Sequence, residues 1–443
     1  MPQQYINRRR FLELGIAAGA AGAALPQLPT GVLAGSRPPS SDRAERASTK
    51  KVKPAAAVAT SDRLLVLIEM DGGHDGMSMT PPIGTKYGRY ASLRSRIALP
   101  EASVLPLTTE VGLHPNLAKM HARYVAGSGL GVIAGVGITT PDLSHFEMLR
   151  RWWAGDRSST TLTPTGFLGR LCDAVAERDS IADAPAVGVS LGYGPSPSLV
   201  SDLASTLSVN PYDDGGFPVF WDTPVDTVWK AAWKMMCESK DPKATVPFKA
   251  ARHGAAYAEL FADNVMASLG PAGSNYPTDA DLGYQLSLAA RLLASNQGVR
   301  IVHVPFEGDF DTHNNHVERH GAMMTLLDNA LDAFLVDLEA KGIADKVLVA
   351  TFSEFGRRVA DNDSNGLDHG AASFTLVAGA PAATGVFGQY PAFASDADLD
   401  ADGDLVATVD MWELYSTLAN WMGIPGADLG LGSAAPVPGV LLA

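Results

Sequence analysis

The sequence predicts an α/β protein in which a largely parallel central sheet lies between layers of helices. The first observation is a set of short runs, rich in Val, Ile and Leu, that are apolar on both faces. The second is that helical patterns separate most of these runs. Strands that are buried on both faces and connected through helices are typical of parallel sheets, because the connecting helices cover the faces. One large domain is therefore expected rather than several small ones.

Six runs are expected to form strands, and five segments with helical spacing of apolar residues are expected to form helices. The strands are Leu64–Met70, Leu130–Val136, Ala186–Leu191, Val299–Phe306, Val347–Phe352 and Phe374–Ala378. The helices are Leu117–Ala126, Phe146–Ala154, Leu168–Arg178, Ala280–Ala294 and Val317–Lys341. A further stretch, residues 223–269, is rich in alanine and is interpreted as a helical insertion. The predicted single domain spans residues 61–443.

The amino terminus has the pattern of an export signal. Asn7–Glu13 contains a twin arginine followed by Phe-Leu, and Leu14–Ser36 is uncharged. This resembles the twin-arginine translocation signal of bacteria, and Val32–Ala34 fits the small-residue rule for cleavage. A membrane anchor is the weaker interpretation, because Ala and Gly contribute little transfer energy and two prolines interrupt the stretch. We expect a signal peptide over residues 1–36, recognised by the twin-arginine export machinery, and a periplasmic or extracellular protein.

The next segment, residues 37–60, is rich in Pro, Ser, Ala and Lys and is expected to be a disordered linker. No later segment has 18 uncharged apolar residues, so no membrane span is expected in the mature protein.

Charge excludes one class of partner. The net charge is −14, and residues 61–443 hold 25 Lys and Arg against 45 Asp and Glu. Nucleic-acid binding needs a basic surface, so it is not expected. The two cysteines, Cys172 and Cys237, belong to no C-x-x-C pair, which excludes a cysteine zinc site and leaves two buried thiols or one disulfide as alternatives.

Polar side chains collect where the predicted strands end. In an open α/β sheet, ligands bind beyond the carboxyl ends of the strands. Five of the ten histidines fall in five such segments, so these groups are expected to converge on one edge. The segments are Asp71–Gly76, Pro141–Phe146, Asp309–His316, Ser353–Arg357 and Asp368–Gly370.

Carboxylates mixed with imidazoles suit a divalent cation, zinc or manganese before calcium, which prefers more oxygen ligands. The candidate ligands are Asp71, Asp75, Asp311, His313, Glu354, Asp368 and His369. Each segment has a simpler alternative. The Asp71 segment could be a plain turn after a strand, and Asp311 could be a helix cap. Glu354 could form an ion pair with Arg357, and the segment with Asp368 could be a solvated loop.

Two neighbouring residues, Ser144 and His145, are the candidate catalytic pair. Ser144 is a candidate nucleophile and His145 a neighbouring base or ligand. Ser144 could equally cap the helix that begins near Phe146, and both alternatives stay open.

The acidic run Asp398–Asp404 matches the opening of an EF-hand loop. The bidentate Glu of position twelve is missing, because Val409 stands there, and no helix pair flanks the run. An acidic surface turn is therefore expected.

Taken together, these segments resemble a bacterial family named domain of unknown function fifteen-oh-one, within the alkaline-phosphatase and sulfatase-like superfamily. The resemblance covers residues 8 to about 425, and its motifs occur in the same order. They are the twin-arginine leader, Asp71–Gly76, Gly112–Pro115, Ser144–Phe146, Asp311–His313, Ser353–Arg357, Asp368–Gly370 and Asp402–Leu405. The implied fold is alkaline-phosphatase-like, a mixed sheet between helices.

The resemblance also implies roles. Asp71 or Asp75 would be the metal aspartate after the first strand, and Ser144 would stand where the nucleophile is expected. Asp311, His313, Glu354 and His369 would be metal ligands. Two departures matter: phosphatases of the superfamily have Asp-His where this chain has Ser353–Glu354, and the C/S-x-P-x-R signature of formylglycine sulfatases is absent.

Two functional hypotheses follow. The first is an exported metal-dependent hydrolase that acts on a phosphate or related ester, and that is not a formylglycine sulfatase. The second is a secreted scaffold or binding protein that keeps the fold without turnover, which the loss of the Asp-His pair favours.

Overall fold

The computed structural model describes residues 63–158, 163–212, 258, 260–392 and 398–442. They all lie in one of two units of the chain, residues 34–443, which is described here by itself. The predicted signal peptide and linker lie outside the described residues, as does Cys237. So does most of the predicted helical insertion, of which Phe261–Val265 and Met266–Ser268 are described as short helical turns.

A single large sheet forms the centre of the described residues, which hold nine of its strands in the order β10-β4-β9-β8-β1-β7-β5-β6, with β11 also paired to β4. The central strands are β1 (Leu64–Met70), β7 (Ile301–Phe306) and β8 (Val347–Phe352). The remaining strands are β4 (Leu130–Gly137), β5 (Gly188–Ser190), β6 (Thr206–Ser208), β9 (Ser373–Ala378), β10 (Gly385–Gly388) and β11 (Val409–Asp410).

Most neighbouring strands are parallel. β1 pairs in parallel with both β7 and β8, and the parallel order continues through β5 to β6. Among the nine described strands only β9 is reversed: it is antiparallel to β8 on one side and to β4 on the other. Two reversals cancel, so β4 runs in the same direction as β1. The carboxyl ends of β1, β4, β7 and β8 therefore meet at one edge, together with the amino end of β9.

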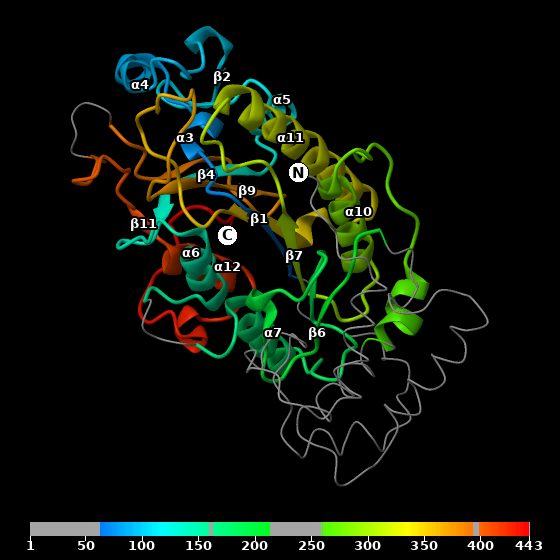
Figure 1. Ribbon diagram of the computed structural model, residues 1–443. Coiled ribbons are helices and arrows are strands. Elements are labelled where there is room, and N and C mark those ends of the chain that lie inside the picture. The colour runs from blue at the N-terminus through cyan, green and yellow to red at the C-terminus, as the bar shows by residue number, and fades with distance from the viewer. Residues whose placement is uncertain (1–62, 159–162, 213–257, 259, 393–397, 443) are drawn as a thin grey trace, which may run out of the picture. The chain divides into compact units, whose positions relative to one another are not determined.

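Helices cover both faces of the sheet (Figure 1), and the alternation along β1 shows why. Leu64, Val66 and Ile68 join one hydrophobic cluster, and Leu65 and Leu67 join the other. The first cluster packs against α5 (Ala118–Val125), α10 (Asp281–Ala294) and α11 (His316–Ala340). The second packs against α6 (His145–Ala154), α7 (Phe167–Arg178) and α12 (Met411–Trp421). The predicted α/β sandwich is confirmed.

Smaller elements lie near the sheet edges. Two short helices, α3 (Gly76–Met79) and α4 (Tyr87–Leu93), follow β1. A separate antiparallel pair consists of β2 (Leu105–Pro106) and β3 (Gly112–Leu113). Cys172 is a buried free thiol on α7. Among the described residues, no helix is long and apolar enough to cross a membrane.

Candidate metal centre

Four side chains from three separate segments converge at the edge where the strands end. His145 begins α6 beyond β4, Asp311 and His313 follow β7, and His369 precedes β9. The Nε2 atom of His369 lies 3.1 Å from Nε2 of His145 and 3.0 Å from Nε2 of His313. Asp311 Oδ1 is 3.1 Å from His313 Nε2, 3.5 Å from His369 Nε2 and 3.8 Å from His145 Nε2. The predicted convergence therefore exists for these four residues.

The other ring nitrogen of each imidazole has an acceptor. Nδ1 of His145 is 2.6 Å from Glu354 Oε1, Nδ1 of His369 is 2.8 Å from the carbonyl oxygen of Leu143, and Nδ1 of His313 is 3.1 Å from Asp368 Oδ1. Because a carbonyl or carboxylate oxygen only accepts, these contacts assign the ring proton to Nδ1. In the neutral rings the three Nε2 atoms then carry lone pairs.

Lone pairs that face each other at 3.0–3.1 Å repel unless a cation or a shared proton lies between them. The separations suit a cation. Tetrahedral ligands at 2.0–2.1 Å from zinc are about 3.3 Å from one another. The distances between the ligand atoms of His145, Asp311 and His369 are 3.1, 3.5 and 3.8 Å, so all three lie within 4.8 Å of one another, as one ion requires. His313 is the neighbouring fourth candidate. Imidazole nitrogen with one carboxylate fits zinc or a similar transition metal.

Asp311 is held by a buried guanidinium. Arg357 Nη2 donates to Asp311 Oδ1 at 2.6 Å, and the same side chain donates to the carbonyl oxygens of Gly72, Gly73 and Leu367. Burial alone would raise the pKa of Asp311, but the hydrogen bond and charge of Arg357 keep the pKa below its ordinary value. Arg357 therefore forms its ion pair with Asp311, and not with Glu354 as the simpler alternative had it.

Glu354 lies behind the candidate ligands, in contact with His145. It is fully buried, and its carboxylate accepts from His145 Nδ1 and from the Gly72 N–H at 3.0 Å. Burial raises the pKa of Glu354, but hydrogen bonds, first that of His145, more than compensate and leave the pKa below its ordinary value. Conversely, the hydrogen bond to Glu354 raises the pKa of His145. Such a carboxylate–histidine pair orients the imidazole toward a metal.

Asp71 is half-buried and close enough to interact with Glu354 and His145. Burial, followed by the negative charges of Glu354 and Glu69, raises the pKa of Asp71 to about 6. Its carboxyl group thus changes charge near neutral pH.

Asp75 is not part of this cluster. Both of its carboxylate oxygens bind the buried Arg94, with Oδ1 at 2.9 Å from Nη2, and Oδ2 also accepts from the Ser78 N–H at the start of α3. Burial would raise the pKa of Asp75, but Arg94 holds it well below its usual range. The two aspartates of the first turn, Asp71 and Asp75, therefore have different environments.

Ser144 occupies the N-cap position of α6, yet its side chain makes no capping hydrogen bond. Its backbone N–H donates to Asp142 Oδ1 at 2.9 Å, and the residue is exposed. The Ser144 hydroxyl therefore does not cap α6, and Ser144 directly precedes His145 in the chain.

A second, buried group of imidazoles contains His74 and His316, which stand in the polar segments expected to converge, together with His114 and His320, which were not recognised from the sequence. The rings of His74, His114 and His316 lie 5.3, 5.7 and 4.9 Å from the ring of His320. Burial lowers the pKa of both His74 and His114 to about 4. These rings are therefore neutral at neutral pH. The signal available in the sequence was the spacing of His316 and His320, four apart on α11.

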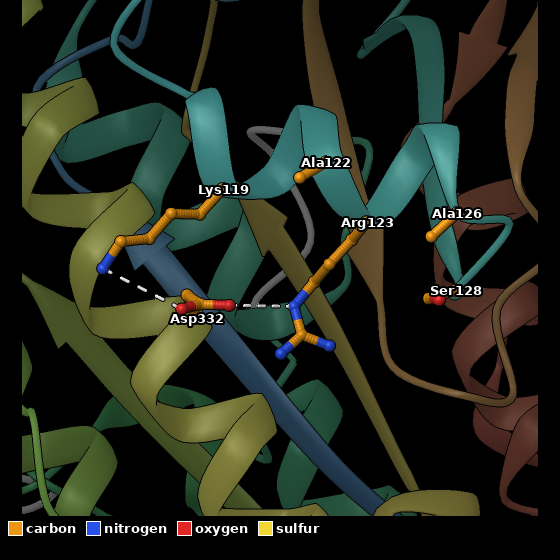
Figure 2. Close-up of a pocket in the computed structure, with 6 residues that line it drawn as sticks. All are labelled: Lys119, Ala122, Arg123, Ala126, Ser128 and Asp332. Atoms are coloured by element: carbon orange, nitrogen blue, oxygen red, sulfur yellow. Dashed lines mark hydrogen bonds and ion pairs between the residues drawn. The ribbon is translucent and has the colours of Figure 1, made fainter.

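A surface hollow of about 350 Å3 lies elsewhere, between α5 and α11 (Figure 2). Lys119 and Arg123 of α5 extend toward Asp332 of α11, and the Arg123–Asp332 contact is 3.0 Å. None of the residues that line the hollow belongs to the candidate metal centre.

Comparison with known proteins supports the sequence resemblance. Residues 258–430, which include Asp311, His313, Glu354 and His369, match the model of the family described as "Protein of unknown function (DUF1501)". No curated protein is significantly similar to the chain.

Among solved structures, the chain is similar to the C-terminal periplasmic domain of EcEptC from Escherichia coli in complex with Zn. The sequence identity is 10%, the match covers 83% of this chain and 84% of that chain, and the TM-score is 0.37. A protein in the alkaline phosphatase superfamily from Vibrio parahaemolyticus has 11% identity, with 86% and 74% covered and a TM-score of 0.36. The phosphonate monoester hydrolase SpPMH from Silicibacter pomeroyi has 11% identity, with 85% and 76% covered and a TM-score of 0.37.

These structural likenesses are remote. The family match is direct over part of the chain: the segment from residue 258 to residue 430 carries the sequence pattern of the DUF1501 family, whereas the motifs before residue 258 lie outside the matched segment.

Proposed function

We propose that this chain is an exported hydrolase that depends on a divalent metal and cleaves phosphate or related esters. One observation carries the proposal: three imidazole nitrogens and the Asp311 carboxylate meet at the edge of the sheet, each imidazole with its Nδ1 proton held by an acceptor. Zinc is the preferred ion, with manganese as the alternative. Export rests on the twin-arginine pattern of residues 8–12.

Each residue has a defined task in this proposal. His145, Asp311 and His369 would hold the ion, with His313 beside them. When bound, the metal supplies positive charge that lowers the pKa of an oxygen nucleophile and stabilises the transferring group. Glu354 accepts the Nδ1 proton of His145, and the Leu143 carbonyl oxygen accepts the Nδ1 proton of His369. The Nε2 atoms of both rings therefore keep their lone pairs available to the metal.

Two further groups contribute to the chemistry. The exposed hydroxyl of Ser144, next to His145, is the proposed nucleophile; no capping hydrogen bond restricts it. Asp71, with a pKa of about 6, is suited to accept or release a proton at the edge of the site near neutral pH. It is partly exposed and can therefore exchange protons with solvent.

The test is to measure metal content and initial rates on aryl phosphates, phosphodiesters and aryl sulfates for protein purified from the periplasm. We expect His369→Ala to lose both metal and turnover. Ser144→Ala should keep its metal and lose turnover, and His121→Ala, outside the cluster on α5, should keep both. If Ser144→Ala retains full turnover, a metal-bound water replaces Ser144 as the nucleophile. Protein that stays metal-free after incubation with zinc, manganese or calcium would refute the proposal.

A binding protein without turnover is the second candidate. The position of Glu354 favours it, because this carboxylate is fully buried and already accepts from His145 and from the Gly72 N–H. Stoichiometric metal with no turnover of any of these esters would support this candidate against the hydrolase.

A further inference from the structure

A buried chain of contacts runs inward from the turn that carries Asp311 and His313. Thr312 stands between these two candidate ligands, and its Oγ1 atom lies 2.8 Å from Nδ1 of His316, the first residue of α11. On the other side of the ring, Nε2 of His316 lies 3.3 Å from Asp75 Oδ2. Thr312 is fully buried, and His316 and Asp75 are each 1% exposed. The chain of contacts is therefore shielded from water.

The proton positions in this chain follow from its acceptor. A carboxylate oxygen only accepts hydrogen bonds, so Nε2 of His316 carries the ring proton that faces Asp75. Ser78 Oγ, 3.0 Å from the same nitrogen, can accept this proton as well. Burial lowers the pKa of His316, so the ring is neutral at neutral pH and Nδ1 keeps its lone pair. The Thr312 hydroxyl therefore donates to Nδ1.

Arg94 anchors the far end of the chain. Its guanidinium binds both oxygens of Asp75, with Nη2 at 2.9 Å from Oδ1. The same side chain donates to the carbonyl oxygens of Arg358 and Val359, at 3.1 and 2.9 Å, directly after Arg357 in the chain. Arg94 thus links the turn after β1 to the segment that contains Arg357.

Thr312 is held from two sides. Its hydroxyl donates to His316, and its carbonyl oxygen accepts from the Leu367 N–H at 3.1 Å. A hydroxyl that is buried this deeply is costly unless it forms a hydrogen bond, so the contact with His316 fixes its direction. The peptide groups on both sides of Thr312 are then fixed as well. With them are fixed the directions in which the side chains of Asp311 and His313 leave the backbone.

We propose that Thr312 and His316 are positioning residues of the candidate metal centre: they hold Asp311 and His313 in place and are not ligands themselves. The inference rests on the metal centre of the proposed function, but it does not require turnover. It also gives a task to Asp75, which lies outside the metal centre and orients the His316 ring. Removing such a partner behind the ligands typically weakens metal binding by about 10- to 100-fold.

The experiment uses Thr312→Val, which keeps the shape of the side chain and removes the hydroxyl, in the mature full chain. Metal is removed with a chelator, and zinc affinity is then measured by competition with a chelating dye. The visible absorption spectrum of the Co²⁺-loaded protein reports the geometry of the ligands. We expect Thr312→Val to bind zinc at least about tenfold more weakly than the parent and to change the Co²⁺ spectrum.

Two variants separate positioning from stability. Thr312→Ser keeps the hydroxyl and should have the zinc affinity and the Co²⁺ spectrum of the parent. The matched control is Thr417→Val on α12, which removes a buried hydroxyl that donates to the Glu413 carbonyl oxygen at 2.8 Å. Thr417→Val should be less stable in urea titrations, yet keep the zinc affinity and the Co²⁺ spectrum of the parent. If Thr312→Val does not fold, Thr312→Ala removes the same hydroxyl without placing a methyl group against His316.

Three results would overturn the inference. They are parent-like zinc affinity and Co²⁺ spectrum in the variants without the Thr312 hydroxyl, an equal loss of affinity in Thr312→Ser, and an equal loss in Thr417→Val. A parent protein that binds no zinc would instead refute the metal centre itself, and the inference with it. In a parent that binds metal without turnover, the same two measurements still decide the inference, because neither depends on catalysis.

Discussion

Acid should destabilise the fold through the buried imidazoles. His74 and His114 have pKa values of about 4 in the folded state, against 6.5 for an unperturbed imidazole. The unfolded chain therefore binds more protons as the pH falls. The stabilisation is complete above pH 6.5 and is lost progressively between pH 6.5 and pH 4. From pH 7.5 to pH 5, linkage gives a loss of about 2 kcal/mol for each histidine.

Two carboxyl groups oppose this loss of unfolding free energy at low pH. The effect of one histidine is therefore best measured as a difference in unfolding free energy between a variant and the parent. Asp71 and Asp404 have folded pKa values of about 6, above the ordinary carboxyl value, and a fall in pH through that range stabilises the fold. His114→Gln isolates one imidazole, because a glutamine oxygen can still accept the Asn116 N–H that His114 Nδ1 accepts at 3.1 Å.

The assay is urea unfolding at pH 7.5 and pH 5, followed by circular dichroism, with EDTA present so that metal ligands do not contribute. The loss of unfolding free energy between the two pH values should be about 2 kcal/mol smaller in His114→Gln than in the parent. His121→Gln, outside the imidazole group, should behave as the parent does. An equal loss in His114→Gln and the parent would refute the role of burial at His114.

Three further substitutions test the support of the metal centre. Glu354→Gln should weaken metal binding by about 10- to 100-fold, as equilibrium dialysis would show, because His145 loses its charged acceptor; unchanged affinity would remove Glu354 from that role. Arg357→Lys keeps the positive charge but not the several N–H donors that hold Asp311 and the turn after β1. Metal affinity should therefore fall in this variant. Trp152→Phe leaves the Glu354 carbonyl without its 2.8 Å indole donor and should lower the unfolding free energy by about 1–3 kcal/mol in urea titrations. Unchanged stability would show that another donor replaces it.

Periodicity and apolar runs were sufficient to predict the sheet. β1 and β8 begin and end at the predicted residues, because both are buried on both faces and bounded by polar turns. The reversal of β9 could not be predicted, since strand direction depends on pairing partners far away in sequence. α12 was missed although Asp410 and Glu413 form a capping box at its start.

The sequence predicted which residues stand near the candidate site, but not which of their side-chain atoms face one another. Strand ends located His369, Asp311 and His313, because topology alone brings such ends together. The sequence could not show which side of each imidazole a carboxylate would contact: Glu354 and Asp368 lie at Nδ1 of His145 and of His313, whereas Asp311 lies near their Nε2 atoms. Similarly, Asp75 differs from Asp71 because of Arg94, a partner that no local pattern identifies.

The distance in sequence between the converging histidines sets the order of assembly. His145 and His369 are 224 residues apart, and β1, at the centre of the sheet, pairs with β7 and β8 from much later in the chain. Such long-range closures are slow, and the unfolded chain keeps the ligands apart. Metal binding can then only follow the folding transition, so it would slow unfolding while leaving the folding rate unchanged. The metal would prolong the lifetime of the finished molecule rather than guide its formation.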